Sequence, residues 1–204
     1  IRIPKQLLNP DFRFALCRFN GKLPMEMKWN TVNNYQFFHS KLYNHRGNYI
    51  ICGGYGNLII LDFDSMKFYE EVESKLPSTF TVRTALKRLP HLYYILEGEM
   101  FKKIGIDRDG KRVCDIQSEG SGVVGPNSHI DRLFYDVVRD IPIATITHEA
   151  LRFAFGELIF ERRSEWKGTE SKPNPEAVKQ AIMILSHNGI KQNGDLLFKC
   201  GLHP

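Results

Sequence analysis

The stretch that decides the fold is Asn57-Leu58-Ile59-Ile60-Leu61-Asp62-Phe63-Asp64-Ser65. Its continuous aliphatic run predicts a strand that is buried on both faces of a sheet. Side chains at positions i and i+2 of a strand share a face, so we expect Asp62 and Asp64 to point the same way, with Cα atoms about 6.5 Å apart. Phe63 is expected to point to the opposite face, into the core.

The segments that follow predict a βαβ unit and then antiparallel strands. Apolar residues recur at helical spacing directly after the strand, at Met66, Tyr69, Val72 and Leu76. Residues 79–84 predict the second strand of the βαβ unit. Further strands are expected at 91–96, 101–106 and 111–117, with a hairpin turn at 107–110 and a short strand at Val123-Val124.

The first third of the chain predicts a small α/β portion. A strand is expected over 12–19, then a short helix capped by Thr31 that reaches Leu42, then a strand over 48–52. The glycines at 53, 54 and 56 match neither phosphate-loop pattern, so we interpret them as a tight turn.

The last third predicts a helix, a linker and a second helical segment. Thr147 is expected to cap a long helix that covers one face of the sheet and reaches Ile159. Residues 167–173 are polar and contain Gly and Pro, which predicts a linker. Asn174-Pro175 then has the signature of a helix start, so we divide the chain into a main domain (1–166), a linker (167–173) and a C-terminal helical segment (174–204).

The composition is that of a globular protein. The chain has 204 residues, of which 42% are hydrophobic and 25% charged, and a formal net charge of +5. No apolar run is long enough to span a membrane and no signal peptide is visible, so we expect a cytoplasmic protein without a membrane partner. The four cysteines lack zinc-site spacing, and Cys52 and Cys114 are interpreted as buried apolar residues.

Basic residues are concentrated in one stretch. Residues 80–113 hold eight Lys and Arg side chains against four Asp and Glu. Such a segment suits a phosphate-rich partner, because clustered cations release condensed counterions when they bind nucleic acid. A solvated hairpin that carries charge for solubility is the alternative interpretation.

The two aspartates that end the buried strand predict a metal site. Carboxylates at such a position are costly unless a cation satisfies them, and oxygen ligands favour Mg²⁺ or Mn²⁺ over zinc. Two such ions about 4 Å apart activate an attacking oxygen and stabilise a leaving oxygen on phosphate. A pair of acids that merely tops an exposed strand end is the alternative.

Two more residues are candidates for the same site. Asp115 lies within a predicted strand that the βαβ-then-hairpin order can bring beside the first one. His91 opens a strand directly after Lys87-Arg88, from where a sheet can present an imidazole and two cations to a triphosphate. Taken alone, His91 is also interpretable as a packed or capping histidine. No cationic neighbour of the three acids is obvious in the sequence.

The order of these motifs resembles the archaeo-eukaryotic primase superfamily, and specifically the bifunctional primase-polymerase (Prim-Pol) domain of archaeal plasmids and related mobile elements. The similarity runs from about Phe14 to Leu151. It rests on segments in family order: 23–29 with its Pro and Trp, the strand 48–54, the DxD strand 58–64, the His motif 89–94, Cys114-Asp115, and the Gly-rich step 120–128. The chain departs from the family at Leu89, where a small residue is usual, and at Lys87-Arg88, where glycines are common.

The resemblance implies an α+β fold in which a small N-terminal α/β subdomain packs on an RRM-like mixed sheet, followed here by a short C-terminal helical appendage. It implies that two Mg²⁺ or Mn²⁺ ions are held by Asp62, Asp64 and Asp115, and that His91 contacts the incoming nucleotide. A 3′-hydroxyl would attack the α-phosphate of a nucleoside triphosphate on a single-stranded DNA template. The resemblance places this reaction in replication initiation of a plasmid or mobile element, together with a helicase domain or subunit. Further candidates for phosphate or nucleotide contacts are Arg83, Lys87, Arg88 and Ser128.

Three other functions compete with this expectation. A two-metal nuclease also needs clustered acids but has no use for a triphosphate-binding His and cations. A DxD glycosyltransferase conflicts with the antiparallel second half of the chain. A non-catalytic module that binds single-stranded nucleic acid would use exposed sheet aromatics such as Tyr93.

Overall fold

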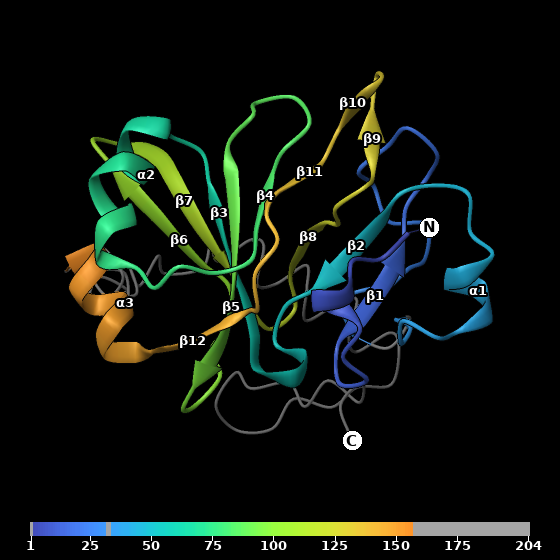
Figure 1. Ribbon diagram of the computed structural model, residues 1–204, viewed down its shortest axis with the longest axis horizontal. Helices are drawn as coiled ribbons and strands as arrows, with labels where there is room; N and C mark the ends of the chain where they lie inside the picture. Colours follow the sequence, from blue (N-terminus) through green and yellow to red (C-terminus); the bar gives the residue numbers. More distant parts are fainter. Residues whose placement is uncertain (1, 32–33, 157–204) are drawn as a thin grey trace, which may run out of the picture. The chain divides into compact units, whose positions relative to one another are not determined.

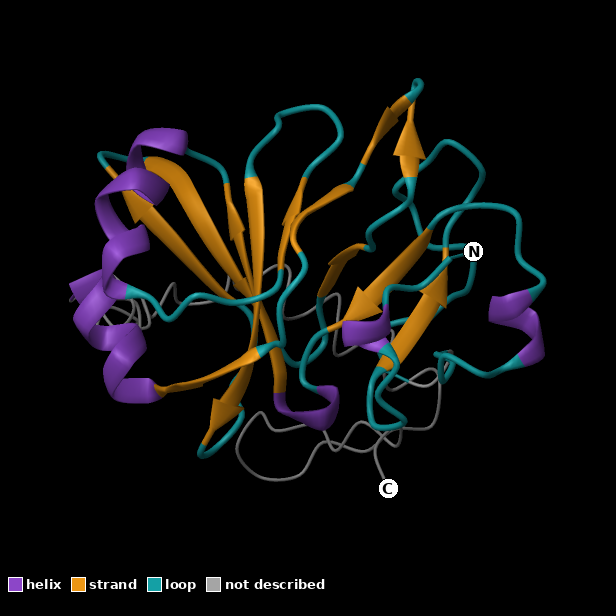
Figure 2. Ribbon diagram, in the orientation of Figure 1, coloured by secondary structure: helices purple, strands orange, loops and turns teal. Residues whose placement is uncertain are grey.

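The computed structural model describes residues 2–31 and 34–156, and this part of the chain has an α+β fold built on two main sheets (Figures 1 and 2). The large sheet holds seven strands: β3 (Leu58–Phe63), β4 (Thr81–Arg83), β5 (Pro90–Glu97), β6 (Ile104–Arg108), β7 (Lys111–Gln117), β11 (Asp136–Arg139) and β12 (Ala144–Thr147). The small sheet holds β1 (Arg13–Leu16), β2 (Tyr49–Cys52) and β8 (Gly122–Val124). A separate hairpin is formed by β9 (His129–Ile130) and β10 (Leu133–Phe134).

The helices are few and short. The α-helices are α1 (Ser40–Tyr43), α2 (Met66–Val72) and α3 (His148–Phe155). Single turns of 3₁₀-helix occur at Lys5–Leu7, Tyr55–Asn57 and Glu73–Lys75. None of the helices in the described part of the chain has the length and apolar composition needed to cross a membrane. The α+β class expected from the sequence is confirmed.

The large sheet is mixed and has β3 near its middle. Its order is β11-β4-β5-β3-β7-β6, and β12 pairs with β5 in parallel while the other pairs are antiparallel. β3, α2 and β4 form the predicted βαβ unit, but β5 lies between its two strands, which makes it a split βαβ unit. The predicted neighbour relation between the strands around Asp62 and Asp115 is confirmed, because β7 pairs with β3.

One face of the large sheet is covered by α2 and α3 (Figure 1). Ile59 and Leu61 of β3 belong to the apolar core under these helices, and Phe63 packs its ring against Phe68 and Phe155. Phe63 therefore points into the core, as its alternation with the two aspartates predicts. Thr147 caps α3 by accepting a hydrogen bond from the backbone N–H of Ala150 at 3.1 Å. The predicted cap is confirmed, and α3 is described as far as Phe155.

The small sheet packs against the other face of β3. Leu58 and Ile60 share a buried cluster with Phe14, Ile51 and Val123 of the small sheet. β3 is thus buried on both faces, as its continuous aliphatic run predicts. Tyr93 of β5 is fully buried in this cluster, so the expectation of an exposed aromatic at that position is wrong.

Local turn chemistry agrees with the sequence at two places. Asp109 and Gly110 have φ values of 52° and 70°, and they join β6 to β7 as a two-residue hairpin turn. Gly54 has φ of 87° and closes the turn between β2 and β3, where a Cβ would meet the backbone of Glu119 at 2.9 Å. The glycine segment is therefore the predicted tight turn.

The helix predicted from Thr31 to Leu42 is wrong over most of its length. Tyr35 forms a bridge with Phe14 of β1, with backbone hydrogen bonds of 2.7 and 2.6 Å, so the chain there is extended. Only α1 is helical, and His39 rather than Thr31 caps it. Pairing with β1 overrides the local preference for helix, because the backbone N–H and C=O of Tyr35 form their hydrogen bonds with Phe14 instead of within a helix.

The other boundaries differ modestly. β1 covers only Arg13–Leu16 of the predicted 12–19, and β6 begins at Ile104 rather than at 101. Cys52 and Cys114 are buried, as expected. The predicted linker (167–173) and C-terminal helical segment (174–204) lie outside the described residues.

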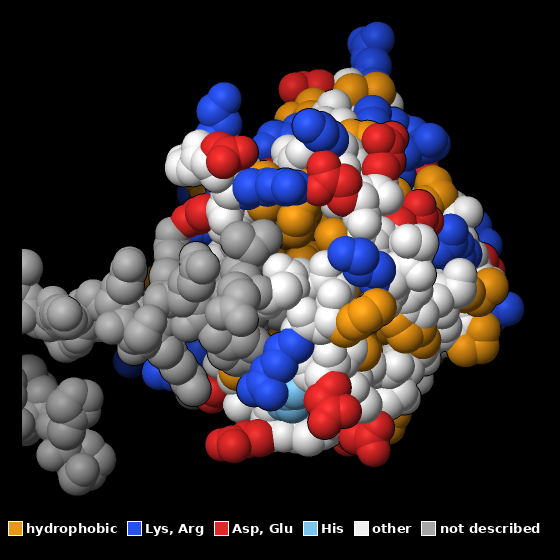
Figure 3. All heavy atoms as spheres, turned by 90° about the vertical axis from the view of Figure 1, so that its left-hand side faces the viewer, with side chains coloured by type: hydrophobic (Ala, Val, Ile, Leu, Met, Phe, Trp, Pro, Cys, Tyr) orange, Lys and Arg blue, Asp and Glu red, His pale blue; other side chains and the backbone are white. Residues whose placement is uncertain are grey.

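On the side of the molecule that carries α2 and β6, Figure 3 shows basic and acidic side chains interspersed, in keeping with ion pairs such as Arg139–Glu73.

Candidate active site

Three strands place the main candidate residues in one row. Asp62 of β3 lies directly opposite His91 of β5 and directly opposite Asp115 of β7. Residues that face each other across antiparallel strands project to the same face, so these three side chains stand on the face of the large sheet that receives the small sheet. Asp64 follows two residues after Asp62, just beyond the end of β3.

Asp62 is the centre of this row. Its Oδ1 accepts a hydrogen bond from Nε2 of His91 at 2.9 Å, and its Oδ2 accepts one from Nε2 of Gln117 at 3.3 Å. Burial by itself raises the pKa of Asp62, but the charge and hydrogen bond of His91, the amide of Gln117 and the charge of Lys103 outweigh burial and lower it below the ordinary value. Asp62 is therefore held as a carboxylate.

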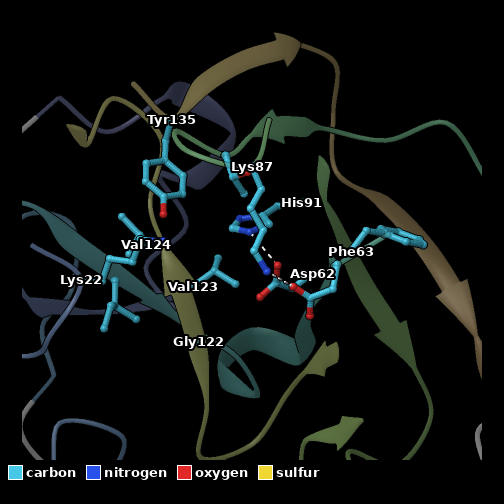
Figure 4. Close-up of a pocket in the computed structure, with 12 residues that line it drawn as sticks. Lys22, Asp62, Phe63, Lys87, His91, Gly122, Val123, Val124 and Tyr135 are labelled. Atoms are coloured by element: carbon cyan, nitrogen blue, oxygen red, sulfur yellow. Dashed lines mark hydrogen bonds and ion pairs between the residues drawn. The ribbon is translucent and has the colours of Figure 1, made fainter. Parts of the chain in front are cut away.

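Asp64 and Asp115 each face a cation. Oδ1 of Asp64 pairs with Nζ of Lys87 at 2.8 Å (Figure 4). Oδ2 of Asp115 pairs with Nζ of Lys103 at 2.7 Å, and its Oδ1 accepts a hydrogen bond from Arg112. The acids thus have cationic neighbours that were not obvious in the sequence. The loop between β4 and β5 brings Lys87 to Asp64, and the β6–β7 region brings Lys103 to Asp115.

A pocket of about 270 Å³ opens at Asp62 and His91 of this row, whereas Asp115 is not among the residues that line it (Figure 4). The large sheet and its loops contribute charged and polar lining: Asp62, Asp64, Thr84, Lys87 and His91. Opposite them stand Lys22, Ile50 and the β8 residues Gly122, Val123 and Val124, together with Tyr135, whose hydroxyl points into the pocket. The pocket therefore has two carboxylates and Lys87 on the side of the large sheet, and Lys22 together with apolar residues on the opposite side.

His91 is buried, and only one of its two ring nitrogens has a hydrogen-bond partner in the part of the chain that the structure describes. Its Nε2 contacts Asp62, whereas its Nδ1 has no hydrogen-bond partner within the described residues. Its ring lies 6.0 Å from the ring of Tyr135, measured between centroids. A histidine that only fills space in the core needs neither a carboxylate partner nor an unsatisfied, buried Nδ1. The environment of His91 therefore favours a hydrogen-bonding role for its Nδ1 at the pocket.

The other predicted contacts lie elsewhere. The guanidinium groups of Arg83 and Arg88 converge on Oδ2 of Asp136, at 3.5 and 2.8 Å, and neither residue lines the pocket. Ser128 is buried outside the pocket lining, and its hydroxyl has no hydrogen-bond partner among the described residues. Of the four secondary candidates, the structure brings only Lys87 to the pocket.

Several residues of the site escaped sequence reasoning. Lys22 comes from a turn after β1, and Tyr135 lies between β10 and β11. Gln117 and Lys103 lie at the open end of the β6–β7 hairpin, where Gln117 contacts Asp62 and Lys103 contacts Asp115. Gln117 is the one with a local signal, because it stands two residues after Asp115 on the same strand and must share its face.

The side chains present fit a hard divalent cation. The donors are carboxylate oxygens, which Mg²⁺ and Mn²⁺ prefer. No three ligating side chains converge on one point within the described residues, because each carboxylate is turned to a nitrogen partner. Lys87 and Lys103 are solvent-exposed enough to release their carboxylates to a cation without unpacking the core.

Comparison with known families gives one match. The family model described as "Bifunctional DNA primase/polymerase, N-terminal" (Prim-Pol) matches residues 9–148, which is more than half of the chain. The matched segment contains every strand that lines the pocket and all the residues in the Asp62-centred row. No curated protein matches the chain.

Proposed function

Because the chain belongs to the family of bifunctional DNA primase/polymerase N-terminal (Prim-Pol) domains, we propose that its pocket carries out nucleotidyl transfer onto a 3′-hydroxyl with two divalent metal ions. The family implies a DNA primase/polymerase that acts on a DNA template and nucleoside triphosphates. The observation that carries the proposal is the register of β5, β3 and β7, which sets His91 and Asp115 on either side of Asp62. Asp62, Asp64 and His91 line the pocket, and Asp115 stands next to it as the strand neighbour of Asp62.

The three carboxylates would hold Mg²⁺ or Mn²⁺. When bound, the ions supply Lewis-acid stabilisation for the charge that develops on the transferred phosphoryl group and its leaving pyrophosphate. Asp62 enters this role already ionised, because His91 and Gln117 keep its pKa low despite burial. Asp64 and Asp115 would exchange their present lysine partners for the ions.

The remaining pocket residues would bind and orient the nucleotide. Lys87, released from Asp64, and Lys22 on the opposite wall supply positive charge for a triphosphate. His91 fixes the orientation of Asp62 through its Nε2 and retains Nδ1 for a further hydrogen bond. Arg83, Arg88 and Ser128 remain candidates for template or nucleotide contacts, and their role would require them to leave the positions described above.

The biological setting belongs to the same proposal. We place the domain in replication initiation of a plasmid or mobile element in the cytoplasm, together with a helicase domain or subunit. A non-catalytic nucleic-acid-binding module is less well supported, because Tyr93 is buried and the sheet face it would need is covered. A nuclease is less well supported because it has no need for Lys87 and Lys22 around a pocket next to the acids.

The test is template-dependent incorporation of labelled ribo- and deoxynucleotides with Mg²⁺ or Mn²⁺. We expect incorporation by the wild type and none by Asp62→Asn, Asp64→Asn or Asp115→Asn. Asp140→Asn is the matched control, because Asp140 is an exposed aspartate outside the pocket lining. Loss of template DNA without incorporation would instead establish a nuclease, and DNA binding that survives EDTA without any turnover would establish a binding module.

A further inference from the structure

Three aromatic rings form a row on the surface next to the candidate active site. The ring of Phe19 meets that of His129 edge-on, with 5.0 Å between centroids, and His129 lies 5.7 Å from Phe134. Phe19 and Phe134 are 71% and 52% exposed. We call these three residues the aromatic patch. Two exposed phenylalanines on either side of a half-buried histidine are unusual for a surface without a partner.

Buried hydrogen bonds hold the patch in place. The amide of Asn48, itself buried, donates to the carbonyl oxygens of Gly21 and His129 at 2.9 and 2.7 Å and accepts from the N–H of His129 at 3.0 Å. Asn20 and Asp131 add a reciprocal pair of hydrogen bonds at 2.8 and 2.6 Å. The turn after β1 and the β9–β10 hairpin are thus tied together, so the rings are presented in a fixed arrangement.

The β9–β10 hairpin has a tight turn that fixes its direction. Asp131 and Arg132 both have positive φ, 48° and 70°, as a two-residue turn with matching strand twist requires. In Figure 1 the hairpin continues from the end of β8 and projects from the molecule before the chain returns through β11. Its two neighbours in sequence, β8 and Tyr135, both line the active-site pocket.

The patch lines a groove whose residues adjoin those of the pocket in sequence. The groove measures about 510 Å³ and is lined by Phe19, Asn20, His129, Asp131, Arg132 and Phe134. Phe134 directly precedes Tyr135 of the pocket, and its carbonyl oxygen accepts a hydrogen bond from Arg88 at 3.3 Å. Exposed cations accompany both the pocket and the groove: Lys22 lines the pocket and Arg132 lines the groove, and Arg18 directly precedes Phe19 on the turn after β1.

We propose that the aromatic patch binds the single-stranded DNA template by base stacking, with Arg18, Lys22 and Arg132 contacting its phosphates. Exposed rings next to cations are the combination that single-strand binders use, because every base offers a π-face to an aromatic ring while the cations follow the backbone. The aromatic patch supplies the first element, and Arg132 in the groove together with Arg18 and Lys22 on the neighbouring turn supplies the second. This inference rests on the proposed function, since it assigns the template of that same pocket.

The test compares DNA affinity in three phenylalanine variants of the full chain. Phe19→Ala, Phe134→Ala and Phe153→Ala are titrated against a fluorescein-labelled oligothymidylate at fixed salt, with anisotropy as the readout. Phe153 is the matched control, because it is 72% exposed but lies on α3, away from the groove. Loss of one stacked base is worth roughly five- to a hundredfold in Kd, so we expect that loss in the first two variants and none in the control.

An abasic oligonucleotide of the same length separates stacking from charge. Wild type and both patch variants should bind it with equal affinity, because it has phosphates but no bases. Unchanged affinity of the variants for oligothymidylate would overturn the proposal, as would an equal loss on the abasic strand. An oligomer that dissociates in the variants while their DNA affinity stays that of the wild type would assign the patch to a second copy of the chain, which also overturns it.

Failure of this inference is distinguishable from failure of the proposed function. If the protein incorporates nucleotides but its DNA affinity is unchanged by the patch substitutions, only the inference about the aromatic patch is wrong. If DNA affinity depends on the patch but the protein never incorporates nucleotides, the inference stands and the proposed polymerase activity is wrong.

Discussion

Replacement of Asp115 by Asn separates two roles of this residue in a single experiment. The substitution keeps the shape of the side chain and removes its charge. The side chain of Asp115 is 13% exposed and pairs with Lys103, at 2.7 Å, and with Arg112. Asn would leave these two cations side by side without their shared anion. Without metal, we therefore expect the variant to be less stable than the wild type, although mutual repulsion of the three acids alone would predict the opposite sign.

The magnitude follows from the exposure of the partners. Breaking a fully buried ion pair costs about 3–5 kcal/mol, whereas a surface pair is worth at most about 1 kcal/mol. Lys103 and Arg112 are 42% and 36% exposed, and Arg112 keeps a second partner in Asp107 at 2.5 Å. The expected loss is therefore about 1–2 kcal/mol, or roughly 2–8 °C in Tm for a chain of this size.

Addition of metal reverses the comparison for the wild type only. At a Mn²⁺ concentration of 100 Kd, a ligand that binds only the folded state adds about 2.7 kcal/mol. The wild type should gain this stability, and Asp115→Asn should lose most of it. The assay is thermal unfolding of wild type, Asp115→Asn and the Asp140→Asn control, each in EDTA and in Mn²⁺. An unchanged or higher Tm of Asp115→Asn in EDTA would refute the ion-pair account, and equal stabilisation by Mn²⁺ would refute its role as a ligand.

Three further predictions follow from individual contacts. His91→Ala should weaken nucleoside triphosphate binding roughly tenfold to a hundredfold, because a charge-assisted hydrogen bond is lost. It should weaken Mn²⁺ binding mainly at acidic pH, because the pKa of Asp62 rises when its histidine partner is removed. Unchanged affinity for both ligands would contradict this prediction. The pKa of Asp62 in the folded protein lies below the ordinary value of 3.8, so the ionised carboxylate stabilises the fold above pH 3.8. This contribution is lost as the pH falls from 3.8 through the folded-state pKa. The difference in unfolding free energy between wild type and Asp62→Asn, measured by urea titration, should therefore shrink over this acidic range. Asn48→Ala should lower the free energy of unfolding by roughly 2–4 kcal/mol, because the partly buried peptide groups of Gly21 and His129 lose their hydrogen-bond partner. A loss below about 1 kcal/mol would show that the hairpin is held by other contacts.

Local chemistry in the sequence predicts the elements that carry the site. The aliphatic run before Asp62 identifies β3, and the period of two in a strand places Asp62 and Asp64 on one face with Phe63 on the other. The Thr147 cap and the Asp109-Gly110 turn are similarly readable, because capping and positive φ depend on residues a few positions apart. The helix expected after Thr31 fails for the opposite reason, since Tyr35 pairs with a strand far away in the sequence.

The partners of the site residues are decided by tertiary structure. Asp62 meets His91 and Asp115 only through the register of β5 and β7 on β3, and one residue of slippage would turn the imidazole or the carboxylate to the other face. Arg83 and Arg88 lie near His91 in sequence, yet the pairing of β11 with β4 sets Asp136 opposite Arg83 and draws both guanidinium groups away from the pocket.

The sequence by itself therefore determines which strand bears the acids and which face they share, because these follow from alternation within one segment. Which cations neutralise them is decided by strand pairing within the large sheet, which brings Lys87 to Asp64 and Lys103 to Asp115. That Lys22 and Tyr135 complete the pocket, and that Phe19 lies beside His129, is decided by how the small sheet and the β9–β10 hairpin pack. These contacts join residues up to more than a hundred positions apart, as in the hydrogen bond between Asn20 and Asp131. No local pattern encodes such a distance, because the contact exists only after the intervening strands have paired.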